Sequence, residues 1–318
     1  MNTMSKEWRF KAITNIWTGN AERQNQQLIL PGLLGSIRWW FEVVVRGLGG
    51  YACDPTAKSR CPVENKNNQN EKCHCVVCEL FGCTGWARKF RFEVVDESGQ
   101  PIQNAISANT IFILRFTPLR MICDEEWALL DLTLRIISEY TALGGKTVFK
   151  PSDEKGREMM IHHRDYGLIT LEGNPELFTI GKDNLQKYIK RPNWCKSSHD
   201  ADDFNWASLS HFWVVKGRYL ARQSDYHSTF NRLLGRPEEK GRSSWGKSWL
   251  AGSQRESKKV FSFKTRGYER TYGFVLKNSD FSEIENTLRE VWNIQGNQEF
   301  RFLTGESILE TLVNHQGG

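Results

Sequence analysis

Residues 30–50, LPGLLGSIRWWFEVVVRGLGG, decide how the rest of the chain is interpreted. Apolar residues recur there at spacings of three and four, which predicts a helix with one wide apolar face. The apolar positions are Ile37, Trp40, Phe41, Val44 and Val45. Pro31 and Gly32 indicate a turn before the helix, and the glycines after Arg46 favour its end. We expect an amphipathic helix over about residues 36–46.

Two arginines of this helix are candidate phosphate ligands. Arg38 and Arg46 are eight residues apart, with Glu42 between them. A helix that starts from a glycine-containing loop, with arginines beside it, can bind a phosphate. A buried ion pair with Glu42 explains both arginines equally well.

Composition limits the class of protein. The chain has 318 residues, enough for two domains, and 39% hydrophobic with 25% charged residues is typical of a globular protein. A formal net charge of +6 permits an anionic partner without requiring one. No apolar run is long enough to cross a membrane, and the N-terminal residues lack the apolar core of a secretory signal. We therefore expect a cytoplasmic protein without a membrane partner.

The order of the expected elements is the same in both halves of the chain. In the first half we expect strands at 8–16, 87–95, 110–116 and 167–171, and helices at 36–46 and 124–143. In the second half we expect strands at 212–220, 260–266, 271–276 and 300–303, and helices at 226–234 and 282–291. Each set gives the order βαββαβ. The predicted class is α+β, with two tandem ferredoxin-like (RRM-like) domains at 1–190 and 191–318, separated by a polar, turn-rich stretch.

A cysteine-rich insertion, about residues 51–86, interrupts the first domain. Six of the eight cysteines lie between Cys53 and Cys83, and a disulfide framework is not expected in a cytosolic chain. The CVVC spacing of Cys75 and Cys78 lets two thiolates reach one tetrahedral metal ion. We predict a structural zinc site within this insertion. The predicted ligands are Cys61, Cys73, Cys75 and Cys78, with Cys53, His74 and Cys83 as alternatives.

The second half carries a basic, aromatic segment. Residues 241–277 contain nine Lys or Arg and two acids, with seven aromatic residues between them. Cations that neutralise phosphates and rings that stack on bases are what single-stranded RNA binding requires. We expect Lys258, Lys259, Arg266 and Arg270 to contact phosphates. A solvated hairpin whose rings face the core is the alternative.

The segment ALGGKT at residues 142–147 resembles a nucleotide-binding loop only in part. A Walker A loop needs glycine at position 140, where this chain has Tyr140, and the segment follows a helix. ATP or GTP binding is therefore excluded here. The two glycines could still bring backbone amides against a phosphate, and Lys146, Lys150 and Arg164 are further candidate RNA contacts.

Two adjacent histidines are candidates for catalysis. His162 and His163 could act as general acid and base in RNA cleavage. Histidines on a polar surface loop are the more common case.

Several of these stretches together resemble the RAMP superfamily of CRISPR effector subunits, in particular those of type III-B (Cmr) complexes. The matching stretches are ILPGLLGSIRWWFEVVVRGLGG, CVVCELFGCTGWARKFRFEV, ALGGKT, DYGLI and ESKKVFSFKTRGYERTYGFVL. The resemblance implies a cytoplasmic, non-catalytic subunit that caps a guide-RNA filament and helps to receive target RNA. Its partners would be guide RNA, target RNA and other RAMP subunits.

The resemblance also bears on catalysis. Target-cleaving members of this superfamily carry an aspartate in the loop between the first strand and the first helix, and here Glu22 is the only acid in that loop. No catalytic residue is therefore predicted. Two alternatives stay open: a guide-RNA-processing endoribonuclease that uses His162 or His163, and a free-standing zinc-containing RNA-binding module.

Overall fold

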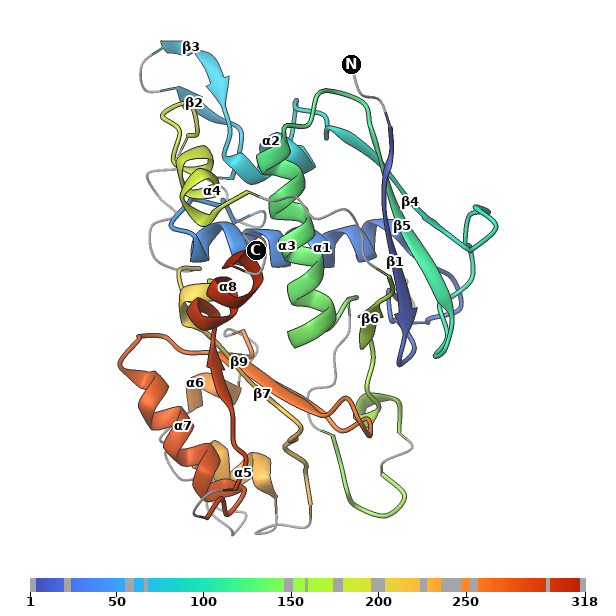
Figure 1. The fold of residues 1–318 in the computed structure, drawn as a ribbon, viewed down its shortest axis with the longest axis vertical. Helices are drawn as coiled ribbons and strands as arrows, with labels where there is room; N and C mark the ends of the chain where they lie inside the picture. Colours follow the sequence, from blue (N-terminus) through green and yellow to red (C-terminus); the bar gives the residue numbers. More distant parts are fainter. Residues whose placement is uncertain are drawn as a thin grey trace.

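The computed structural model describes residues 4–19, 24–54, 60–65, 68–145, 151–157, 160–173, 180–195, 204–223, 228–235, 248–251, 257–295 and 298–314 (Figure 1). The protein is α+β with antiparallel sheets, and this predicted class is confirmed. No helix within the described residues is long and apolar enough to span a membrane.

The first half of the chain builds a four-stranded sheet covered by two long helices. Its elements are β1 (Lys6–Ala12), α1 (Leu30–Gly47), β4 (Phe90–Val95), β5 (Ile111–Pro118), α3 (Asp124–Tyr140) and β6 (Ile169–Leu171). The strand order is β4-β5-β1-β6, with every neighbouring pair antiparallel. Helix α1 starts at Leu30 and not near residue 36, because Pro31 falls in its first turn, where a missing N–H costs nothing.

The insertion and the segment after β6 add smaller elements. These are the hairpin β2 (Val63–Asn65) and β3 (Asn68–Cys73), the short helix α2 (Val76–Phe81), a 3-10 turn η1 (Ile161–His163) and α4 (Lys182–Ile189). Helices α2 and α4 lie near the hairpin, at the end of α1 away from β6 (Figure 1).

The second half builds another four-stranded antiparallel sheet. Its elements are η2 (Leu209–His211), β7 (Phe212–Lys216), α5 (Thr229–Leu233), α6 (Ser248–Ala251), β8 (Val260–Phe263), β9 (Arg270–Phe274), α7 (Asp280–Val291), β10 (Phe302–Thr304) and α8 (Gly305–Asn314). The strand order is β10-β7-β9-β8. In both sheets the first strand of the unit lies between its third and fourth strands, and the second strand is at an edge.

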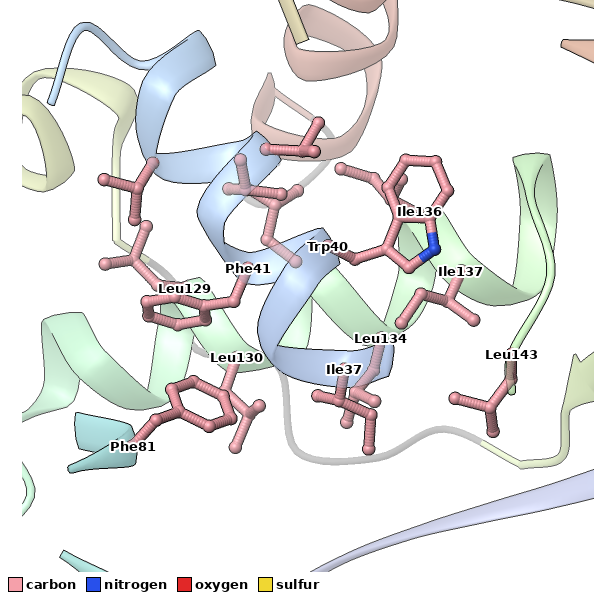
Figure 2. Close-up of a cluster of buried hydrophobic side chains, with 14 of the residues drawn as sticks. Ile37, Trp40, Phe41, Phe81, Leu129, Leu130, Leu134, Ile136, Ile137 and Leu143 are labelled. Carbon is pink, nitrogen blue, oxygen red and sulfur yellow. The ribbon is translucent and has the colours of Figure 1, made fainter. Parts of the chain in front are cut away.

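One hydrophobic core joins the two sheets through α1. Ile37 and Phe41 of α1 lie against α3, with Leu130 and Leu134 among the buried residues around them (Figure 2). The Trp40 ring instead contacts Phe212, Tyr272 and Phe274 of the second sheet, with ring centroids 5.8–6.2 Å apart. A smaller cluster on the other face of the second sheet, which includes Trp213, Ile284 and Leu288, packs α7 against it.

Hydrogen bonds also join the two halves. Oδ2 of Asp165 accepts hydrogen bonds from the backbone N–H groups of Lys264 and Thr265 at 2.8 and 2.7 Å, and from the Thr265 hydroxyl at 2.6 Å. Upstream, Arg222 donates its backbone N–H to the carbonyl of Pro151 at 2.7 Å. Pro151 and Asp165, both between the glycine loop and β6, therefore contact the second half of the chain.

Candidate metal centre and nucleic-acid interface

Four buried cysteines of the insertion converge on one point. The sulfur atoms of Cys53, Cys61, Cys75 and Cys78 all lie within 4.8 Å of one another, and those of Cys53 and Cys78 are 3.6 Å apart. A tetrahedral ion with zinc–sulfur bonds of about 2.3 Å places its sulfur ligands roughly 3.8 Å apart. The donor set and its dimensions therefore fit a closed four-thiolate metal site.

Local structure explains how this cluster forms. Cys75 is the residue before α2, and Cys78 lies one helical turn later, so both thiols point to the same side. The backbone N–H of Cys75 donates to the sulfur of Cys61 at 3.3 Å, and Arg38 donates to the sulfur of Cys78 at 3.2 Å. Hydrogen bonds with Cys53, Cys61 and Cys78 hold the pKa of Cys75 well below its ordinary value. Hydrogen bonds among the same thiols raise the pKa values of Cys61 and Cys78. A metal ion binds the thiolate form, so its binding would release the protons of these thiols.

The remaining cysteines of the insertion lie outside the cluster. Cys73, a predicted ligand, forms a disulfide with Cys195, 122 residues later, and Cys53 lies in the cluster in its place. Cys195 reaches this position because its backbone N–H donates to the carbonyl of His74 at 3.1 Å. The imidazole of His74 lies 2.6 Å from a carboxylate oxygen of Glu79, and Cys83 is a free, half-buried thiol. One disulfide, Cys73–Cys195, is therefore present in a chain for which the sequence predicted no disulfide framework.

The two arginines of α1 surround a buried carboxylate. Glu42 is 3% exposed, and its oxygens lie 3.0 Å from Arg38 Nε and 3.7 Å from Arg46 Nη2. Arg46 also donates to the carbonyls of Ala52 and Ala207 at 3.1 and 3.2 Å, and its side chain is 8% exposed. Burial raises the pKa of Glu42 to about 7, although the two arginines oppose this shift. This is the ion-pair arrangement that the sequence left open, and it occupies both guanidinium groups internally.

A groove of about 210 Å³ lies between α1, the glycine loop and the hairpin β8–β9, and we call it the aromatic groove. Its lining residues are Ser36, Trp39, Trp40, Ala142, Gly144, Gly145, Phe261 and Tyr272. Trp39 and Phe261 are half-buried, so their rings border the opening. Rings beside a glycine loop are suited to stacking on bases while backbone amides approach a phosphate.

Backbone contacts fix the glycine loop at this groove. Gly144 has a φ of +118°, and a side-chain carbon there would lie 2.8 Å from the carbonyl oxygen of Trp17. Its N–H donates to the hydroxyl of Ser36 at 3.0 Å. Sequence reasoning did not single out Ser36, because nothing in the local pattern links it to a residue 108 positions away.

The four cations expected on the hairpin differ in exposure. Arg266 lies exposed in the turn, and Lys258 is half-buried with its amine 5.3 Å from the ring centre of Phe230. Lys259 is 2% exposed and donates to the carbonyl of Ser257 at 3.1 Å. Arg270 is 5% exposed and donates to the carbonyls of Ser138 and Thr141, each at 3.2 Å. Arg270 thus binds the C-terminal end of α3, where a cation is favourable, and burial lowers its pKa to about 10.

The remaining predicted site residues come from parts of the sequence outside α1, the cysteine-rich insertion and the hairpin. Lys146 and Lys150 lie outside the described residues, as does Glu22. Arg164 is exposed next to the 3-10 turn that holds the two histidines. The rings of His162 and His163 lie 4.3 Å apart, and His163 is 5% exposed. Lys258 lies near the aromatic groove, with its amine 5.6 Å from the ring centre of Phe261. Arg266 instead lies in the β8–β9 turn, whose backbone binds Asp165, two residues after His163.

Comparisons with known proteins match this chain to a family model and to solved structures. Residues 9–149 match the family model of the RAMP superfamily. The crystal structure of Cmr1 from Pyrococcus furiosus in its apo form is similar, with 13% identity, 86% of this chain and 89% of that chain covered, and a TM-score of 0.43. A cryo-EM structure of the type III-B Cmr-beta bound to cognate target RNA is also similar, with 9% identity, 91% and 100% covered, and a TM-score of 0.43. No curated protein matches the chain.

Proposed function

From the match of residues 9–149 to the RAMP superfamily, we propose that this chain is a non-catalytic RNA-binding subunit of a type III-B-like CRISPR effector complex. It would correspond to the first-numbered subunit of Cmr complexes, work in the cytoplasm, cap the guide-RNA filament and help to bind target RNA. Its partners would be guide RNA, target RNA and other RAMP subunits. Its two sheets would be tandem ferredoxin-like domains, divided near residue 190.

The aromatic groove is the observation that carries this proposal. It lies between the two sheets, at the glycine loop whose backbone amides could approach a phosphate, and its lining offers half-buried rings instead of an acid–base pair. Exposed Arg266 and half-buried Lys258 flank the same hairpin and would neutralise phosphates. Stacking plus phosphate neutralisation binds a single strand without cleaving it.

The cysteine cluster would hold a structural zinc ion. Four thiolates fill all positions of a tetrahedral site, which leaves none open for a reacting water. Its role would be to stabilise an insertion whose hairpin, β2 and β3, is short and polar. Cys53, Cys61, Cys75 and Cys78 would be the ligands.

Two experiments test this proposal. Native purification of the chain, followed by identification of co-purified proteins and sequencing of co-purified RNA, should recover other RAMP subunits with guide RNA. Recovery of the chain alone would favour the free-standing module.

The second experiment tests the groove with purified protein. Phe261→Leu should weaken binding of single-stranded RNA about tenfold, because one stacked base contributes about 1–3 kcal/mol. Phe300→Leu, which alters a half-buried ring packed on the other face of the second sheet, is the matched control. Equal affinities of the two variants would exclude the groove. RNA cleavage that is lost in His163→Ala would overturn the non-catalytic assignment in favour of the endoribonuclease.

A further inference from the structure

Three cations are aligned across neighbouring strands at one end of the second sheet. Lys216 of β7 lies directly opposite Arg270 of β9 in the antiparallel register. On the other side of β7, Phe302 pairs with Val215, so Arg301, the residue before β10, comes beside Lys216. Directly opposed residues of antiparallel strands project from the same face. We call Arg301, Lys216 and Arg270 the cation row.

Packing identifies the face from which this row projects. Phe212 and Val214 of β7 belong to the core shared with α1 and α3, whereas Trp213 and Val215 belong to the cluster behind the sheet. Lys216 continues the alternation of Phe212 and Val214. The cation row therefore points toward the C-terminal end of α3.

Two cavities border the row and share Lys216. The larger, of about 470 Å³, is lined by Lys216 and Arg270 together with the end of α3, β6 and the β8–β9 turn, and we call it the β6 cleft. The smaller, of about 130 Å³, is lined by Lys216, Arg301 and residues of α8. A ligand in the β6 cleft is thus within reach of Lys216, Arg270 and the half-buried ring of Tyr268, while Arg301 lies on the other side of Lys216.

The positive charge of the row is only partly compensated within the chain. The carboxylate of Glu139 lies 4.0 Å from the Lys216 amine, and both side chains are more than 40% exposed. Glu269, the other acid of the cleft, accepts a hydrogen bond from the N–H of Gly267 at 2.8 Å. Arg301 is exposed and has no hydrogen-bond or ion-pair partner among the described residues.

Like charges placed directly opposite one another destabilise a sheet. Burial lowers the pKa of Lys216; Glu139 opposes this shift, while Arg270 and Arg301 add to it. An anion between the cations would remove this repulsion. Arg270 is already bound to the end of α3, and the Lys216 amine lies 4.3 Å from the ring centre of Tyr140. Lys216 and Arg301 are therefore the exposed cations of the row that a negatively charged ligand would meet.

We propose that the cation row and the β6 cleft bind the phosphodiester backbone of single-stranded RNA, as a second contact beside the aromatic groove. This inference rests on the proposed RNA-binding function. The end of α3 separates the two sites, with Ala142 and Gly144 on the groove side and Ser138 and Glu139 on the cleft side. Strand β9 runs along both sites, so one RNA strand can follow it from stacked bases to neutralised phosphates.

The test is a charge-neutralising double variant of the full chain, Lys216→Gln/Arg301→Gln. Arg270 is kept because it caps α3. Arg91→Gln/Lys277→Gln removes two exposed cations away from the cleft and is the control.

In salt titrations with a fluorescent single-stranded RNA of mixed sequence, the Lys216→Gln/Arg301→Gln variant should lose affinity. Its salt slope should fall by about 1.4, since each phosphate contact on a single strand contributes about 0.7. Its thermal midpoint should stay the same or rise, because repulsion is removed.

The outcomes separate this inference from the proposed function. If wild type binds RNA and the double variant keeps the slope of the control, the cation row is not an RNA contact, while the proposed function stands. If wild type binds no RNA, the proposed function fails, and inorganic tripolyphosphate then decides the site. A higher thermal midpoint with tripolyphosphate in wild type, lost in the double variant, supports a phosphate site. Equal shifts in both proteins overturn it.

Discussion

At the scale of single residues, several charges of this protein are buried inside it. Glu42, Arg46, Lys259 and Arg270 are each nearly inaccessible, and the cations among them donate to backbone carbonyls. A buried charge without a partner costs several kcal/mol, so these contacts are needed for folding. Counting charges along a sequence does not distinguish buried charged residues from those that face a ligand. The distinction needs the strand register, which decides to which face each side chain points.

Glu79 illustrates how one network of buried charges responds to pH. Partial burial raises its pKa, but hydrogen bonds from His74 and Lys89 outweigh this effect and hold the pKa at about 2. The pKa in the folded state is thus below the ordinary 4.5, so ionised Glu79 stabilises the fold above about pH 4.5. This contribution should be lost as the pH falls from about 4.5 toward 2.

Urea unfolding at several pH values checks this expectation. The difference in unfolding free energy between wild type and Glu79→Gln should be largest near neutral pH and should shrink on acidification. Glu93→Gln, at a carboxylate paired with the exposed Arg91, is the control and should differ little from wild type at any pH. A difference for Glu79→Gln that does not change with pH would contradict the assigned role.

At the scale of elements, we expect the four-cysteine cluster to stabilise the insertion. Cys53→Ser should abolish stoichiometric metal binding by protein purified without added metal, because a three-thiolate site holds zinc more weakly. It should also lower the thermal midpoint. Cys83→Ser, which removes a free thiol outside the cluster, should keep both at the wild-type level. Metal content by mass spectrometry decides the result, and a metal-free wild type would exclude the site.

The same element shows what the sequence can and cannot predict. The CVVC spacing is local, so Cys75 and Cys78 could be identified directly. The other two positions of the cysteine cluster depend on how β2 and β3 pair and on Cys195, which forms a disulfide with Cys73 from 122 residues away. Spacing alone could not separate Cys53 from Cys73.

The strands themselves could be predicted from local patterns, but contacts that depend on how distant strands pair could not. Alternating apolar residues indicated the strands of both sheets, and the order βαββαβ follows from the sequence of elements. The cation row could not be foreseen, because Lys216 and Arg301 are far apart in sequence and become neighbours only when β10 pairs with β7.

At the scale of the whole molecule, the two halves should unfold together. Asp165→Ala removes three hydrogen bonds that join the segment before β6 to the β8–β9 turn, and it leaves partly buried donors without acceptors. We expect a loss of about 2–4 kcal/mol in unfolding free energy, since each orphaned donor costs about 1–3 kcal/mol. Unfolding should stay a single transition by both fluorescence and circular dichroism, because the core is shared.

The control is Asp153→Ala, at a half-exposed carboxylate 3.6 Å from the Lys264 amine, which should cost less than about 1 kcal/mol. Two separate transitions in wild type would show that the halves are independent domains.

Trp40 has a consequence for how this protein receives a long ligand. Its ring projects from α1 and packs against Phe212, Tyr272 and Phe274 of the second sheet, so it helps to fix that sheet against the helix. A hinge motion that closes the two sheets around a ligand would break these ring contacts. We therefore expect the two sheets to keep their relative position, so that a bound RNA strand would have to adapt its own shape to the protein.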